Sequence, residues 1–166
     1  MNKAVFLDRD GVVNKEMGKY VFLEESFVLN KDLIQSLRLL IENHFLIIII
    51  TNQGGIAKGI YTKDNVEALH KGFVKKMEKE KIHITDIYYC PHHPDIGKCL
   101  CRKPGSLMLE KAIARYNIDV SESFMIGDSD RDIEAAEKVN VKAIKIEANT
   151  SILSVCKEII RHSIHK

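Results

Sequence analysis

Short apolar runs alternate with amphipathic helical stretches along the whole chain, and this alternation constrains the fold more than any other feature. The clearest run, FLIIII at residues 45–50, is continuous and rich in β-branched side chains. Such a run is expected for a central strand of a parallel sheet that is covered on both faces. Other runs of strand length predict strands at residues 4–7, 84–89, 123–126 and 143–146.

Helices are expected between these strands. Asn30 can cap a helix that runs to about residue 43, and Thr62 can cap a long helix that reaches about residue 81. Residues 106–116 and 130–139 predict two more helices, and Thr150 or Ser151 opens a terminal one. Strands that alternate with helices predict a central parallel sheet with helices on both faces, a Rossmann-like three-layer α/β fold. No repeat or linker interrupts the pattern, so residues 1–166 are expected to form a single domain.

Composition and charge narrow the classes of partner. A chain of 166 residues can bury a core without disulfides, and a net charge of +2 is too small to favour nucleic acid or an anionic membrane. The longest apolar run is far short of the ~20 residues that span a bilayer, and acidic residues appear before a signal-peptide core could form. We expect a cytoplasmic protein with neither nucleic acid nor membrane as a partner, and no long exposed apolar helix suggests more than a monomer.

Polar residues follow the predicted strands where the strands end. These segments are DRDG at residues 8–11, TNQGG at 51–55, RK at 102–103 and GD at 127–128. In open parallel sheets, ligands bind beyond the carboxyl ends of the strands, at the point where the strand order reverses. The sequence therefore predicts that these segments line one crevice.

Asp8 and Asp10 are candidates for a metal site. Side chains two apart on a strand point to the same side, so both carboxylates can face one ligand while Arg9 points away. Two close carboxylates require a cation between them, and magnesium is the hard cation that suits oxygen ligands. Asp128 supplies a third carboxylate, and Asp132 could brace it or the ion. An Asp-x-Asp-Gly sequence by itself more often forms a solvated turn, but the set at separate strand ends favours a site.

The segment after residue 50 has the composition of a phosphate cradle. Thr51 and Asn52 offer a hydroxyl and an amide, and Gly54 and Gly55 allow the main chain to approach a ligand closely. Lys103 would add a positive charge against a phosphoryl group. The alternatives are a capped loop after the strand and an exposed lysine at the start of a helix.

Three of the four cysteines crowd into one short loop, which favours a metal over disulfides in a reducing compartment. Cys90, His92, Cys99 and Cys101 make a four-ligand set suited to tetrahedral zinc of the structural type. His93 competes with His92 for the second position, and unliganded thiols are the alternative. Cys156 lies in an apolar helical pattern and is expected to be a core residue.

Four motifs together resemble the haloacid dehalogenase-like (HAD) phosphatases. They are FLDRDGVVN (residues 6–14), TNQGGIAKG (51–59), YYCPHHP with CLCRKP (88–94 and 99–104) and IGDSDRD (126–132). More narrowly, they resemble the zinc-containing branch that holds the heptose-bisphosphate phosphatases and the histidinol-phosphate phosphatase domains.

The resemblance implies a role for each matched residue. Asp8 would be the nucleophile that takes the phosphoryl group, and Asp10 the general acid and then the base that activates water. Magnesium would be held by Asp8, the main-chain carbonyl of Asp10 and Asp128. Thr51 and Lys103 would complete the catalytic set. Substrate binding is expected from Asn14, Asn52, Gln53, Gly54 and Arg102, and structural zinc binding from Cys90, His92, Cys99 and Cys101.

The resemblance also implies an open site, because the chain is too short to hold the cap domain found in many relatives. Residues 14–27, residues 54–61 and the zinc loop would then set specificity. The expected reaction is removal of the 7-phosphate from D-glycero-manno-heptose 1,7-bisphosphate, in the synthesis of bacterial cell-envelope sugars such as those of lipopolysaccharide. A short zinc loop keeps histidinol phosphate as the alternative substrate, and a zinc-stabilised binding module without catalysis is the non-enzymatic alternative.

Overall fold

A five-stranded sheet organises the described part of the protein, residues 1–164, in the computed structural model. The strands are β1 (Lys3–Leu7), β2 (Phe45–Asn52), β3 (Asp86–Cys90), β4 (Phe124–Gly127) and β5 (Lys142–Lys145). Their order is β3-β2-β1-β4-β5, and every neighbouring pair is parallel. The predicted parallel α/β fold is confirmed. The last two residues of the predicted domain, 165 and 166, lie outside the described residues.

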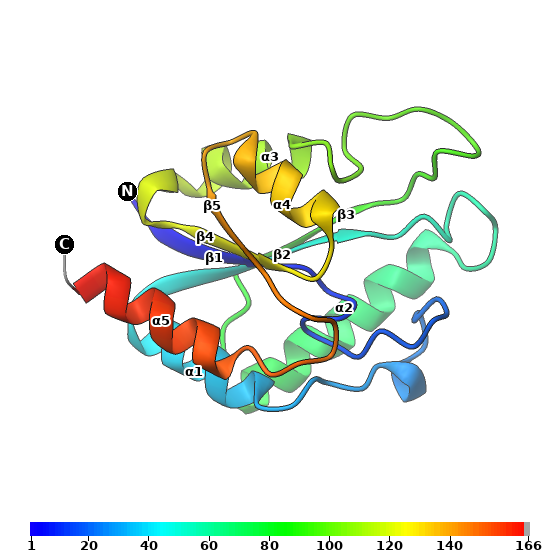
Figure 1. The fold of residues 1–166 in the computed structure, drawn as a ribbon. Coiled ribbons are helices and arrows are strands. Elements are labelled where there is room, and N and C mark those ends of the chain that lie inside the picture. Colours follow the sequence, from blue (N-terminus) through cyan, green and yellow to red (C-terminus); the bar gives the residue numbers. More distant parts are fainter. Residues whose placement is uncertain (165–166) are drawn as a thin grey trace.

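Helices cover both faces of this sheet. Figure 1 shows α3 (Leu107–Tyr116) and α4 (Asp130–Glu137) on one face, and α1 (Leu33–Glu42), α2 (Lys63–Lys79) and α5 (Leu153–Ile164) on the other. Two short 3-10 helices, η1 (Glu24–Ser26) and η2 (Val120–Glu122), lie in the connections. Among residues 1–164 these elements leave no inserted cap domain over the sheet.

The apolar run at residues 45–50 is buried on both faces, as its composition predicts. Ile47 and Ile49 pack in the cluster that includes side chains of α1, α2 and α5. Ile48 and Ile50 pack in the opposite cluster, with side chains of α3 and α4. This strand, β2, lies inside the sheet next to β1, which takes the middle position. The alternation of side chains along β2 therefore divides the core into two layers.

The connection from β3 to β4 creates the point at which strand order reverses. The chain first adds β2 and β3 on one side of β1, then crosses to add β4 and β5 on the other side. Asp8 follows directly after β1, between the ends of β2 and β4. Its position is therefore the one where open parallel sheets bind their ligands.

Of the two residues predicted to cap helices α1 and α2, one is confirmed and one is wrong. Thr62 caps α2 through a capping box with Asn65, as predicted. The prediction that Asn30 caps α1 is wrong, because α1 begins after Asp32, at Leu33. The buried Asn30 amide instead donates to the carbonyl oxygens of Val12 and Asn14, at 2.9 and 3.3 Å. Its side chain is engaged in holding the loop after β1.

The contrast between two glycines gives a test of this packing. A Cβ at Gly127, the last residue of β4, would lie 2.5 Å from the Asp132 carboxylate, whereas a Cβ at Gly72 in α2 would meet no atom within 4 Å. We expect Gly127→Ala to lower the free energy of unfolding by about 1–3 kcal/mol through overpacking. Gly72→Ala should raise it by up to about 1 kcal/mol, because alanine favours a helix interior. Urea denaturation of both variants measures the two signs, and two changes of the same sign would contradict this account.

Candidate active site

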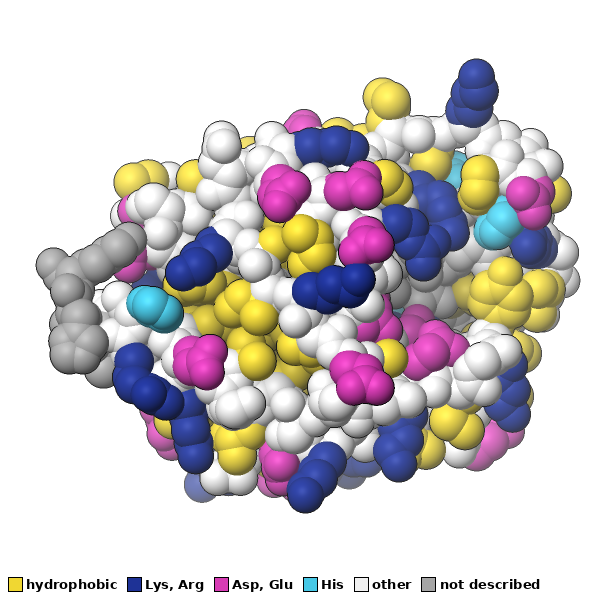
Figure 2. Space-filling model, viewed as in Figure 1, with side chains coloured by type: hydrophobic (Ala, Val, Ile, Leu, Met, Phe, Trp, Pro, Cys, Tyr) yellow, Lys and Arg dark blue, Asp and Glu magenta, His cyan; other side chains and the backbone are white. Residues whose placement is uncertain are grey.

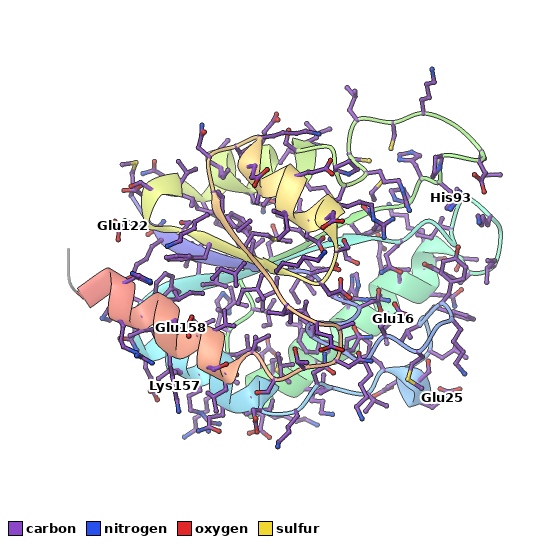
Figure 3. The ribbon with its side chains drawn as sticks, viewed as in Figure 1. Glu16, Glu25, His93, Glu122, Lys157 and Glu158 are labelled. Atoms are coloured by element: carbon purple, nitrogen blue, oxygen red, sulfur yellow. The ribbon has the colours of Figure 1, made fainter. Side chains whose placement is uncertain are left out.

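A cavity of about 370 Å³ opens beyond the carboxyl ends of the central strands. In Figure 2 it corresponds to the hollow on the right of the molecule, where Lys, Arg, Asp and Glu side chains gather. Figure 3 labels two of its lining residues, Glu16 and His93, on the loops that follow β1 and β3. The predicted residues that line it are Asp8, Asp10, Thr51, Asn52, Gln53, Gly54, Arg102, Lys103 and Asp128.

Three carboxylates lie close together in this cavity. Oxygen atoms of Asp8, Asp128 and Asp132 all lie within 4.8 Å of one another. An all-oxygen set of this kind fits a hard divalent cation such as magnesium. The Asp10 side chain is outside this group.

Lys103 is the buried positive charge beside these carboxylates. Its Nζ lies 2.8 Å from Asp8 Oδ1 and 2.6 Å from Asp132 Oδ1, and it donates to the carbonyl oxygen of Ile50 at 2.7 Å. Asp132 in turn accepts from the main-chain N–H and hydroxyl of Ser129 at the start of α4. The lysine is therefore fixed between the nucleophile candidate and a helix N-terminus.

Burial and repulsion between the carboxylates raise the pKa values of Asp8 and Asp128 even with Lys103 beside them. Burial raises the pKa of Asp8 to about 7, against the lowering effect of Lys103 and with a further rise from Asp132. Burial and the charge of Asp132 also raise the pKa of Asp128. Burial acts to lower the pKa of Lys103, but Asp8 and Asp132 outweigh it and the pKa is raised. The site therefore favours an additional positive charge.

The Asp10 carboxylate is held by three side chains. Its Oδ1 accepts from Arg9 and from Asn14, each at 3.0 Å, and its Oδ2 accepts from Gln53 at 3.1 Å. The prediction that Arg9 points away from the carboxylates is wrong. β1 ends at Leu7, so the alternation of a strand no longer applies at residue 9, and the buried guanidinium of Arg9 pairs with Asp10.

Two residues that the sequence did not single out support this arrangement. His70 of α2 is buried with its Nε2 3.2 Å from Arg9 Nη1, and burial together with the Arg9 charge lowers its pKa to about 3. Tyr61 donates from its hydroxyl to Gln53 Oε1 at 2.7 Å. His70 contacts a residue 61 positions away and Tyr61 contacts one eight positions away, and no recognised sequence pattern marks either pair.

Two predicted substrate-binding residues are occupied by protein contacts. Asn14 is fully buried, lies outside the cavity lining and donates to Asp10. Asn52 lines the cavity, but its side chain holds the main chain of Lys103 from both sides. The Asn52 amide donates to the Lys103 carbonyl at 3.1 Å and its carbonyl oxygen accepts from the Lys103 N–H at 2.9 Å. Both asparagines therefore orient catalytic candidates.

The Cys/His cluster also assembles. Ligand atoms of Cys90, His92, Cys99 and Cys101 lie within 4.8 Å of one another, and the Cys90 and Cys101 sulfurs are 3.0 Å apart. His92 contributes Nδ1, 3.3 Å from the Cys101 sulfur, whereas His93 lines the cavity. The cysteines, including the buried Cys156, are free. Two histidines competed for one position in the sequence, and the geometry favours His92.

No helix among residues 1–164 is both long enough and apolar enough to cross a membrane.

Comparison with known proteins identifies a matching family and several relatives of this chain. The model of the HAD-hydrolase-like family matches residues 100–151. The chain is 39% identical to D-glycero-alpha-D-manno-heptose-1,7-bisphosphate 7-phosphatase of Photorhabdus laumondii, over 84% of this chain and 79% of that protein. It is 38% identical to D-glycero-beta-D-manno-heptose-1,7-bisphosphate 7-phosphatase of Haemophilus influenzae, over 86% and 79%.

The fold comparison agrees with the sequence comparison. A crystal structure of D,D-heptose 1,7-bisphosphate phosphatase from B. bronchiseptica, complexed with magnesium and phosphate, superposes with a TM-score of 0.88. The match covers 96% of this chain and 99% of that one, at 25% sequence identity. The chain therefore belongs to the HAD-like phosphatase family that contains the D-glycero-D-manno-heptose-1,7-bisphosphate 7-phosphatases.

Proposed function

We propose that this protein is a magnesium-dependent phosphatase that removes the 7-phosphate of D-glycero-manno-heptose 1,7-bisphosphate through an aspartyl-phosphate on Asp8. The observation that carries the proposal is the placement of Asp8 in the cavity, paired with Lys103 at 2.8 Å and close to the carboxylate of Asp128. Curated relatives that act on this sugar bisphosphate support the substrate. A cytoplasmic location and a place in cell-envelope heptose synthesis are parts of the same proposal.

Asp8 begins the reaction as the nucleophile. Its Oδ1 accepts from Lys103 and from the Arg9 main-chain N–H, so Oδ2 is the freer oxygen to attack phosphorus. The Oδ2–phosphorus bond forms as the bond from phosphorus to the sugar oxygen breaks. Asp10, in its protonated form, gives its proton to the leaving sugar oxygen. Lys103 offsets the negative charge on the phosphoryl oxygens.

Asp10 completes the cycle as a base. Having lost its proton, its carboxylate removes a proton from water, and the water oxygen bonds to phosphorus as the bond to Asp8 breaks. Phosphate leaves and Asp10 is again protonated, so the atoms balance over two steps. The main chain at Gly54 and the Arg102 guanidinium line the same cavity and would orient the phosphorylated sugar.

Two metals fit the residues present. Asp8, Asp128 and the Asp10 main-chain carbonyl would hold magnesium, which neutralises phosphate charge when bound. Cys90, His92, Cys99 and Cys101 would hold structural zinc. A zinc at this cluster would stiffen the segment that leads directly into Arg102 and Lys103.

Phosphate release tests the reaction and the substrate together. With magnesium present, we expect release from heptose 1,7-bisphosphate to exceed release from histidinol phosphate. Asp8→Asn should lower kcat by at least about 10³-fold, because it removes the nucleophile while keeping the side-chain shape. A preference for histidinol phosphate would reject the substrate but keep the mechanism. Equal activity of wild type and Asp8→Asn would reject the mechanism.

Thermal unfolding tests the magnesium site through its pH dependence. The raised pKa of Asp8, about 7, means that the metal-free folded protein retains a proton that the unfolded chain releases above about pH 4. This carboxyl's contribution to stability therefore falls as pH rises from about 4 to 7. Magnesium competes with that proton, so the Tm increase on adding it should be larger at pH 8 than at pH 5.

Two aspartate variants, one in the site and one control outside it, complete this test. Asp128→Asn should reduce the magnesium-induced Tm increase, whereas Asp64→Asn, at an exposed position in α2, should leave it intact. An increase of the same size at both pH values, or one that Asp128→Asn does not change, would rule out the site.

Metal analysis tests the Cys/His cluster. We expect one zinc per chain in purified protein, lost or greatly weakened in Cys101→Ser and accompanied by a lower Tm. Cys156→Ser provides the control for zinc content, since Cys156 lies in the apolar core next to α1. Full zinc content in Cys101→Ser would show that the cluster does not bind zinc through this residue.

A further inference from the structure

The two oxygens of Asp10 have different surroundings. Oδ1 accepts from both Arg9 and Asn14, each at 3.0 Å, and is therefore already engaged on two sides. Oδ2 accepts from Gln53 at 3.1 Å. Because Asp10 lines the cavity, Oδ2 is the oxygen available to exchange a proton there. Its position depends on how the Gln53 amide is turned.

The Gln53 amide can face Asp10 with either of its ends. With Nε2 toward Asp10, it donates to Asp10 Oδ2 at 3.1 Å and to Thr51 Oγ1 at 2.9 Å. When Asp10 is ionised, a reversed amide would place its oxygen against the carboxylate, and two acceptors repel each other. The Tyr61 hydroxyl donates to Gln53 Oε1 at 2.7 Å, and together with the repulsion at Asp10 this donor bond favours the orientation with Nε2 toward Asp10.

Tyr61 is itself held firmly. Its ring stacks on Phe22, with centroids 4.9 Å apart and an interplanar angle of 13°. It also makes an edge-to-face contact with Tyr20, with centroids 5.7 Å apart. On another side it lies against Gly55, where a Cβ would clash with the ring. Burial raises the pKa of Tyr61 to about 12, so the hydroxyl keeps its proton and remains a donor.

We propose that Tyr61 is a positioning residue for the acid–base step, and that it acts by fixing the Gln53 amide so that Asp10 Oδ2 faces the leaving oxygen of the substrate. This proposal rests on the proposed phosphatase function. Tyr61 does not touch the reacting atoms, and its effect passes through the chain Tyr61–Gln53–Asp10. Residues 54–61, expected to set specificity, would thus also carry a residue that supports catalysis.

The role has a chemical signature that a purely structural role lacks. A sugar alkoxide is a poor leaving group and needs the proton from Asp10 as it departs, whereas p-nitrophenolate departs without one. The value of kcat/KM reports the steps up to formation of the aspartyl-phosphate. Misplacing Asp10 should therefore lower kcat/KM for the sugar phosphate much more than for p-nitrophenyl phosphate.

The experiment compares Tyr61→Phe with wild type on both substrates, with magnesium present. The variant keeps the ring and removes only the hydroxyl. We expect kcat/KM for heptose 1,7-bisphosphate to fall on the order of tenfold, and kcat/KM for p-nitrophenyl phosphate to change less than twofold. In a Gln53→Met background, Tyr61→Phe should cause no additional loss, because the connection through the amide is already gone.

Tyr116→Phe is the matched control, since its hydroxyl donates to Asp86 at 2.8 Å and both residues lie outside the cavity lining. It should leave both kcat/KM values unchanged. Equal losses on both substrates, no loss in Tyr61→Phe, or a full additional loss in the Gln53→Met background would each overturn the proposal. Wild-type protein that releases phosphate from neither substrate would overturn the proposed function and this proposal with it.

Discussion

The ammonium group of Lys103 is the positive charge around which the carboxylates of the site are arranged. It contacts Asp8, Asp132 and the carbonyl oxygen of Ile50, so it connects the loop after β1, the start of α4 and the strand β2. Burying a charge of this kind is costly unless it is paired and hydrogen-bonded. The pairing links segments that are far apart in sequence at the carboxyl edge of the sheet. It also leaves negative charge in excess, which is the electrostatic basis for a divalent cation at this position.

Much of this arrangement is predictable from sequence because it follows from local patterns. The apolar run in β2 predicts an interior strand, and the rule for open parallel sheets places Asp8, Thr51, Lys103 and Asp128 at one edge. The Cys/His spacing predicts the second cluster equally well. In each case a short pattern contains the information, either as periodic burial or as ligand spacing, and the fold only has to bring the strand ends together.

The supporting residues are not predictable in the same way. Arg9 reaches Asp10 because the strand has already ended, and His70 approaches Arg9 from a helix 61 positions away. Asn30 has the residue type of a helix cap but is used to hold the loop at Val12 and Asn14. These contacts depend on tertiary packing, and the local sequence around each residue does not specify its distant partner. Sequence therefore identifies the groups that would do chemistry more readily than the groups that orient them.

The pair of hydrogen bonds between Asn52 and Lys103 separates Lys103 from the loop that precedes it. Cys90 anchors one end of that loop in the core, and the two hydrogen bonds from Asn52 fix the other end. With both ends fixed, the residues between the candidate zinc ligands, 93–98, can therefore vary in length and composition without moving the lysine. Because His93 of this loop lines the cavity, such changes alter the space open to a substrate and leave the reacting groups in place.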